Sequence, residues 1–173
     1  VTVGKKGTIL TSSDGISWTQ RNSGTSEYLQ GVTYGNGLFV TVGNYGTIFT
    51  SSDGISWTQT TSGTSEGLSV TYGNGQFVTV GSKRTILTSS NGTFWTQRNS
   101  GTSNSLRGVT YGNGLFVTVG KKRTILTSSN GTSWTQRTSG TSEYLQGVTY
   151  GNGLFVTVGK KGTILTSSDG ISW

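Results

Sequence analysis

The chain has 173 residues, with 13 Lys and Arg against 6 acidic residues and a net charge of +7 at neutral pH. It contains no Cys and no His, which excludes disulfides, thiolate metal ligands and catalytic triads built on His. No apolar run approaches the roughly 18 residues that a membrane helix requires, so we expect no membrane partner. The positive charge fits anionic partners, and it equally fits a surface whose charge only keeps the protein soluble.

Five tryptophans recur at nearly constant spacing along the chain. They lie at positions 18, 57, 95, 134 and 173, which are 39, 38, 39 and 39 residues apart. An apolar fraction of 29% with many Gly and Ser residues is a composition found in disordered chains. However, aromatic and β-branched residues alternate in every unit, so we expect order. A fixed period of this length indicates a repeat architecture.

Each unit contains four short stretches with the composition of β-strands. In one unit we expect strands at Leu29–Tyr34, Leu38–Val42, Thr47–Ser51 and Ile55–Gln59. The Asn-Gly and Asp-Gly pairs between strands favour tight hairpins, because both residues accept positive φ. No window has helical periodicity. The sequence therefore predicts an all-β fold, a β-propeller of four-stranded antiparallel blades with a repeat of about 39 residues. A β-solenoid is the rival, but its coils need units of about half this length.

The segment Ser12–Trp18 reads Ser-Ser-Asp-Gly-Ile-Ser-Trp, and every unit carries a version of it. It resembles the Asp-box of sialidase-type and related propellers, with Asn in place of Asp in two of the five copies. The resemblance implies a structural hairpin in which the Asp caps backbone amides and the Trp packs inward, and it implies no sialidase activity. The corresponding turn and core residues are Asp14, Trp18, Asp53, Trp57, Asn91, Trp95, Asn130, Trp134, Asp169 and Trp173.

The units are nearly identical to one another, and residues 1–18 repeat as residues 156–173. This resembles symmetrised propeller designs of the Cake and Scone type. A recently amplified natural bacterial repeat is the rival origin. A designed chain would be expressed recombinantly in the cytoplasm, whereas a natural one is expected to be secreted or on the cell surface. The chain starts without Met and within a repeat, which favours a processed product, a fragment or an engineered chain.

We expect one repeat domain over residues 1–173. It should contain a partial blade at 1–20 and blades at about 28–59, 67–97, 106–136 and 145–173, so that the chain begins at a second strand and stops at a fourth. An open arc would leave two apolar blade faces bare, which is costly. Closure by one chain would give a strained five-bladed ring. Closure by two chains would give eight or nine blades, and this homodimeric ring is the expectation.

Most of the positive charge falls in the turns between second and third strands, which in propellers share a side with the links between blades. We expect a basic rim there, with non-specific polyanion binding as the functional reading and exposed turn charge as the alternative. The basic rim comprises Lys5, Lys6, Lys83, Arg84, Lys121, Lys122, Arg123, Lys160 and Lys161. Arg21, Arg98 and Arg137 begin the links nearby.

Two further kinds of residue suggest sites. Tyr28 and Tyr144, with Glu27 and Glu143, could frame shallow sugar-binding pockets between blades, or else cover blade edges. The three Asp-box carboxylates lie one per turn, too far apart for a catalytic pair or a calcium cage. The sequence therefore predicts no catalytic, cofactor-binding or metal-binding residues. Asn91 and Asn130 match glycosylation sequons, but they arise from the Asp-to-Asn exchange and we expect no glycan.

These observations lead to two hypotheses of function. The first is a non-catalytic, self-assembling propeller scaffold of designed origin, whose partner is itself. The second is a secreted carbohydrate- or polyanion-binding module, similar to lectin propellers. Neither hypothesis includes sequence-specific nucleic-acid binding, a cofactor or an enzyme activity.

Overall fold

The computed structural model describes residues 1–173 and contains only β-strands, turns and two short 3₁₀ segments, Asn44–Gly46 and Lys160–Gly162. The strands form five antiparallel sheets, numbered here in chain order. Sheet 1 contains β1 (Thr2–Val3), β2 (Ile9–Thr11) and β3 (Thr19–Arg21); sheet 2 contains β4 (Leu29–Gly35), β5 (Leu38–Gly43), β6 (Thr47–Ser51) and β7 (Thr58–Thr61); sheet 3 contains β8 (Leu68–Gly73), β9 (Gln76–Gly81), β10 (Ile86–Ser89) and β11 (Thr96–Gln97); sheet 4 contains β12 (Leu106–Gly112), β13 (Leu115–Gly120), β14 (Ile125–Ser128) and β15 (Thr135–Arg137); sheet 5 contains β16 (Leu145–Gly151), β17 (Leu154–Gly159) and β18 (Ile164–Ser167).

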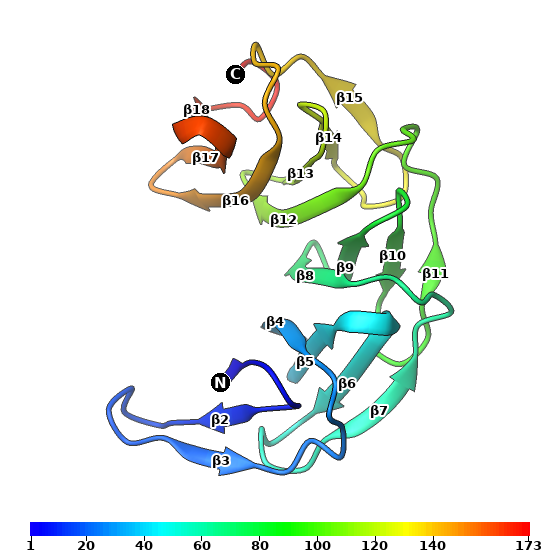
Figure 1. Ribbon diagram of the computed structural model, residues 1–173, viewed down its shortest axis with the longest axis vertical. Helices are drawn as coiled ribbons and strands as arrows, with labels where there is room; N and C mark the ends of the chain where they lie inside the picture. The colour runs from blue at the N-terminus through cyan, green and yellow to red at the C-terminus, as the bar shows by residue number, and fades with distance from the viewer.

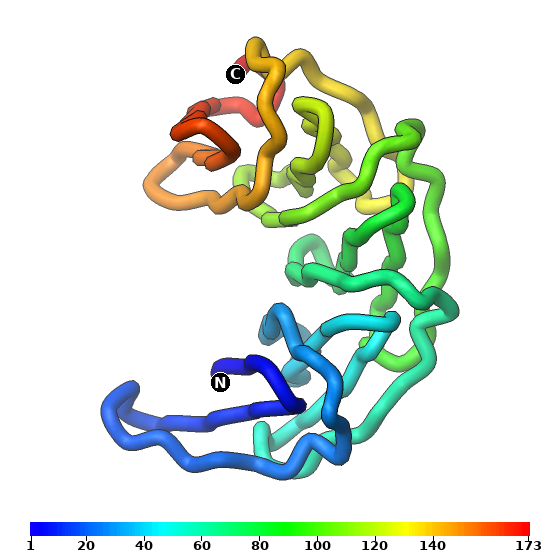
Figure 2. The backbone as a smooth tube through the Cα atoms, in the orientation of Figure 1, coloured from blue at the N-terminus to red at the C-terminus, as the bar shows by residue number.

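The five sheets stand side by side along an open arc (Figure 1). The first strands β4, β8, β12 and β16 line the concave side, and the strands β7, β11 and β15 lie on the outside. The backbone trace shows the N-terminal sheet at one tip of the arc and the C-terminal sheet at the other, with an opening between them (Figure 2). The arrangement is that of propeller blades around an axis, without closure of the ring.

Turn chemistry explains why each unit folds into the same sheet. The first two strands of sheet 2 are joined by Asn36 and Gly37, whose φ angles of 49° and 73° both lie in the left-handed region. Two such residues form the tight hairpin turn whose twist matches that of the flanking strands. The Asn-Gly pair recurs at the same place in sheets 3, 4 and 5, so the local sequence sets the register of every hairpin.

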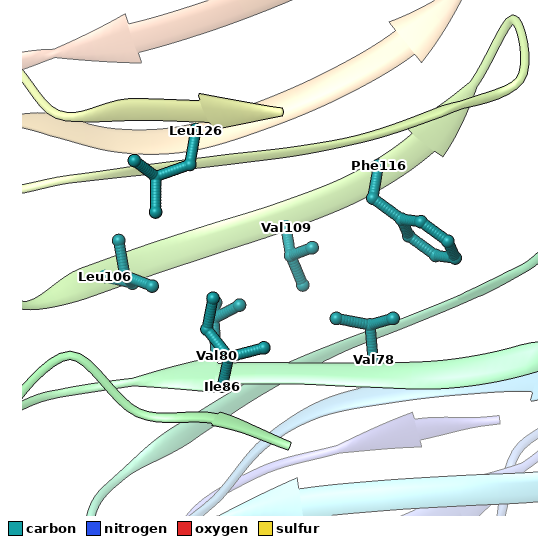
Figure 3. Packing of buried hydrophobic residues seen from close by; sticks show 7 residues of the cluster. All are labelled: Val78, Val80, Ile86, Leu106, Val109, Phe116 and Leu126. Atoms are coloured by element: carbon teal, nitrogen blue, oxygen red, sulfur yellow. The ribbon is translucent and has the colours of Figure 1, made fainter. Parts of the chain in front are cut away.

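The hydrophobic core lies between neighbouring sheets rather than within one sheet. Between sheets 3 and 4, Val78, Val80 and Ile86 face Leu106, Val109, Phe116 and Leu126 (Figure 3). The same layer recurs between sheets 2 and 3 and between sheets 4 and 5. Each sheet therefore depends on the next sheet to remove its apolar face from water, which is the main source of stability in such an array.

The fourth strands start later than the sequence pattern suggested. We expected the fourth strand of sheet 2 at Ile55–Gln59, but β7 spans Thr58–Thr61. Ile55 is exposed, and the Trp57 indole N–H donates to the Gly54 carbonyl oxygen, so the apolar residues before Thr58 belong to the turn. The expectation that the chain stops at a fourth strand is consequently wrong: sheet 5 has strands one to three only, whereas sheet 1 has strands two to four.

Candidate functional sites

The turns between third and fourth strands are organised by their Asp or Asn side chains. The Asp14 Oδ1 atom accepts hydrogen bonds from the backbone N–H groups of Ser17 and Ile16, both at 2.8 Å, and from the Ser12 hydroxyl. Those hydrogen bonds, Ser17 first, lower the pKa of Asp14 to about 2, because they favour the charged carboxylate. In the equivalent turn of sheet 3, the Asn91 Oδ1 atom accepts hydrogen bonds from the backbone N–H groups of Thr93 and Phe94 at 3.0 and 3.1 Å. These side chains are engaged in holding turns.

No three His, Cys, Asp or Glu residues lie close enough together to hold a metal ion. The carboxylates are instead divided between the two sides of the arc. The three Asp residues occupy the turns just described, and the three Glu residues lie in the links between sheets on the opposite side.

The basic rim and the links lie together on one side of the arc, which we call the link side. In sheet 2, the Asn44 N–H donates to the Tyr28 carbonyl of the preceding link, and the Gly46 N–H donates to the Glu66 carbonyl of the following link. All 13 Lys and Arg residues belong to these turns, to the link-side ends of first strands or to the ends of fourth strands. The molecule is therefore strongly polarised, with its cations on the link side and its Asp residues on the other.

Only two of these cations have a carboxylate partner. Lys83 contacts Glu66 at 2.9 Å, and Lys161 contacts Glu143 at 3.0 Å. The hydrogen bond from Lys83 to Glu66 raises the pKa of the Lys83 ammonium group, because it stabilises the charged form. Both lysine heads are exposed, so these pairs contribute little to stability.

The sugar pocket that the sequence suggested at Tyr144 has a different composition in the structure. A hollow of about 270 Å³ is present there, but Arg107, Lys121 and Lys160 share it with Tyr144. The Lys160 ammonium group lies 4.9 Å from the centre of the Tyr144 ring. Glu143 is engaged with Lys161 and does not line the hollow. The hollow is cationic rather than acidic, and Arg107 is a member that sequence reasoning missed.

Three further hollows lie between the ends of the fourth strands and the following links. In sheet 4 the hollow is about 470 Å³ and is lined by Arg123 and Arg137, and in sheet 3 it is about 530 Å³ and is lined by Arg84 and Arg98. The corresponding hollow of sheet 2 contains Gly46 and Thr60 at these two positions. The paired arginines are thus a property of sheets 3 and 4.

The C-terminal tip of the arc exposes a face that is buried in every interior sheet. Val158 is 47% exposed and Ile164 is 66% exposed, whereas the equivalent Val119 and Ile125 of sheet 4 are fully buried. Sheet 5 covers Val119 and Ile125, and no sheet in the chain covers Val158 and Ile164. This bare face is apolar and has the same composition as the covered ones.

A tyrosine and a glycine mark how one sheet docks on the next. The Tyr72, Tyr111 and Tyr150 rings fill the spaces beside Gly35, Gly73 and Gly112 of the preceding sheet, where any Cβ atom would overlap the ring. Two members of this series have no partner. Tyr34 of β4 is 58% exposed, and Gly151 of β16 has no atom outside its chain neighbours within 4 Å of where a Cβ would lie. The sequence did not reveal that Tyr34 and Gly151 lack partners, because the other repeats carry the same Tyr-Gly pair.

Comparison with solved structures identifies the fold. The chain is similar to the computationally designed Ika4 protein (TM-score 0.66, 12% identity, covering 80% of this chain and 89% of that one). It is also similar to YCF48 from Cyanidioschyzon merolae (TM-score 0.71, 17% identity, 96% and 62%) and to the WD40 propeller domain of Doa1 (TM-score 0.67, 16% identity, 95% and 59%). The all-β propeller prediction is confirmed. The chain spans about three fifths of the YCF48 and Doa1 chains.

No family model and no curated protein matches this sequence. At these low identities the structural neighbours show the architecture and nothing about ligands. None of the structure's helical segments has the length and apolarity that crossing a membrane would require.

Proposed function

We propose that this chain is a non-catalytic β-propeller scaffold whose activity is to assemble with a second copy of itself into one closed ring. The observation that carries the proposal is the unpaired Tyr34 and the unfilled space beside Gly151. In the interior of the arc each such tyrosine meets such a glycine, and the two leftover partners belong to β4 of sheet 2 and to β16 of sheet 5. The joint that completes the series therefore brings sheet 5 of one copy against sheet 2 of another.

The two incomplete sheets complement each other in strand content. Sheet 5 has a first strand, β16, which sheet 1 lacks, and sheet 1 has a fourth strand, β3, which sheet 5 lacks. One shared blade can use β16 and β3, with its two middle strands taken from either copy, since residues 1–18 and 156–173 are identical. Sheet 2 already covers Val1, Val3 and Ile9 of sheet 1, which correspond to Val156, Val158 and Ile164.

This sharing of a blade gives each chain four blades, so two copies make an eight-bladed ring. In the single chain the two ends do not meet, which disfavours closure by one chain. The 173 residues then act as one repeat domain. The assignment of the Asp-box family and of a designed, symmetrised origin is part of this proposal, and it rests on the recurring Ser-Ser-Asp-Gly segment and the near-identity of the repeats.

The engagement of the carboxylates in structural contacts supports the non-catalytic part of the proposal. The Asp14 carboxylate is occupied by backbone amides, and two of the three Glu carboxylates are paired with Lys83 and Lys161. A scaffold requires only that its faces fit, and the complementary strand content of sheets 1 and 5 supports such a fit.

The native mass of the chain tests the assembly. We expect light scattering or native mass spectrometry to give twice the chain mass of 18.2 kDa. The Gly151→Ala variant should give the mass of one chain, because the added Cβ would occupy the place of the incoming Tyr34 ring while meeting nothing in the isolated chain.

A matched control removes a large exposed apolar side chain away from the tips. Phe94 is 81% exposed in a turn of sheet 3, and Ser56 and Ser133 occupy the same position in the neighbouring repeats. Phe94→Ser should therefore keep the mass of two chains. A mass of one chain for the unaltered protein at every concentration, or two chains for Gly151→Ala, would contradict the proposed joint.

A further inference from the structure

We propose that the paired arginines of sheets 3 and 4 form two equivalent sites for a tetrahedral oxyanion carried as an ester, that is, a sulfate or phosphate monoester group. This inference goes beyond self-assembly, because both sites belong to the interior sheets 3 and 4 and need no second copy. The sites are the hollows lined by Arg84 and Arg98 and by Arg123 and Arg137.

The first observation is the backbone conformation of one arginine in each pair. Arg84 and Arg123 have φ angles of 61° and 57°, in the left-handed region that disfavours residues with a Cβ atom. The equivalent residues in sheets 1, 2 and 5 are Gly7, Gly46 and Gly162, with φ between 65° and 72°. Sheets 3 and 4 thus place arginine where the other three repeats place the residue that suits the turn. Strain of this kind is characteristic of functional positions.

The second arginine of each pair is held in place. The Nε atoms of Arg98 and Arg137 donate hydrogen bonds of 2.9 Å to the hydroxyl oxygens of Thr88 and Thr127. Both side chains are half-buried, so this bond orients the guanidinium plane while its terminal N–H groups stay available. A preoriented guanidinium loses little freedom when it binds an oxyanion through two parallel hydrogen bonds.

The residues around the two arginine pairs supply further hydrogen-bond donors and include no carboxylate that would compete for the guanidinium groups. No carboxylate lies within ion-pair distance of any of the four arginines, Arg84, Arg98, Arg123 and Arg137. The hollow of sheet 4 is also lined by Thr138, Ser139, Gly140, Thr141 and Ser142. Two guanidinium groups beside hydroxyl and amide groups, with no internal counterion, suit the charge and the hydrogen-bond acceptors of a tetrahedral oxyanion.

Titration of the ¹⁵N-labelled full chain tests the proposal. We expect glucosamine 6-sulfate and glucose 6-phosphate, in separate arms that distinguish the two esters, to shift the amide signals of Ser100 and Ser139 saturably. Ser62 lies in the corresponding hollow of sheet 2, which lacks both arginines, and its signal should not move. Glucose without the ester should shift none of the three. Equal shifts at Ser62, or no saturation at Ser100 and Ser139, would overturn the proposal.

Variants taken from the chain's own repeats separate a built site from general positive charge. The Arg84→Gly, Arg123→Gly double variant carries the residue found at Gly46, so it should fold and should lose affinity by about tenfold or more. Arg98→Thr with Arg137→Thr copies Thr60 and should lose affinity similarly. The control Lys5→Asn, Lys160→Asn removes the same charge from the basic rim and copies Asn44; it should bind within about twofold of the unaltered chain. Equal losses in the control and the arginine variants would refute the sites.

Ester binding by the arginine pairs should not depend on assembly of the ring. The Gly151→Ala variant should bind both esters as the unaltered chain does, because neither hollow contains a residue of the tips. Loss of ester binding in Gly151→Ala would show that the hollows depend on assembly and would overturn their assignment to single sheets. A one-chain mass for the unaltered protein would refute the ring without affecting the arginine sites.

Discussion

The equivalent isoleucines Ile125 and Ile164 offer a direct measurement of what one blade contributes to the stability of its neighbour. Both residues occupy the same place in the third strand of their sheet, in nearly identical surroundings along the sequence. Ile125 is fully buried and packs with Val119 and Leu145, whereas Ile164 is 66% exposed because no sheet follows it. Substituting each by Ala deletes the same atoms from a covered and an uncovered copy of one site.

The expected effects differ severalfold. Removing a buried isoleucine side chain down to Cβ costs about 2–5 kcal/mol in lost burial and residual cavity. In a chain of this size one kcal/mol corresponds to about 2–4 °C in Tm, so Ile125→Ala should lower Tm by about 4–20 °C. Ile164→Ala removes atoms already in water and should change the free energy of unfolding by less than about 0.5 kcal/mol.

The assay is thermal unfolding followed by circular dichroism or calorimetry, in the Gly151→Ala background so that both variants are compared as single chains. Reversibility and a single transition are checked first. Equal losses of Tm for the two substitutions would refute the reasoning, because they would mean that the face bearing Ile164 is covered within the single chain. A negligible effect at Ile125 would refute the assignment of the core to the space between sheets.

Three other outcomes are expected. In the assembled ring, Ile9→Ala and Ile164→Ala should each be tolerated, since either copy can supply the middle strands of the shared blade. The double variant should weaken assembly by about 2–4 kcal/mol per joint, as measured by the dissociation constant. Asp53→Ala should lower Tm more than Asp53→Asn, because only the amide can still accept from the two turn N–H groups; equal losses would contradict the capping role. The pKa values of Asp14 and Asp169 are lowered from 3.8 to about 2. The stabilisation that these charged carboxylates provide is therefore complete above pH 3.8 and is lost as pH falls through 2, so Tm should drop over that window. Replacing all three Asp residues by Asn should flatten the drop.

The regular part of this fold could be predicted because its determinants lie close together in the sequence. The Asn-Gly turns, the alternating strand residues and the recurring Trp all act within one repeat of about 39 residues. The expected side on which Lys and Arg gather also follows from strand order alone. The ion pairs of Lys83 and Lys161 were not foreseen, since each joins a turn to the link that precedes its own sheet, and the sequence does not show which link residue the turn faces.

The fourth strands were misplaced for a local physical reason. Ile55 and Trp57 look like alternating strand residues, but the Asp53 carboxylate captures the amides of Ile55 and Ser56 and closes a turn around them. The tryptophan then returns its indole N–H to Gly54. Side chains that bond to nearby backbone groups compete with strand pairing, and here that competition delays the strand until Thr58.

The sequence by itself determined the repeat, the hairpins and the kind of sheet that each repeat forms, because these depend on interactions between residues a few positions apart. Only the tertiary structure decided which copies are complete, which apolar face is bare, and that Tyr34 and Gly151 lack partners. It also decided that Arg84 and Arg98 line one hollow and that Arg123 and Arg137 line another. Where the repeats carry the same residue, as at Tyr34 and Tyr72, the sequence does not distinguish the copies, and they become different only through the neighbour that each one packs against.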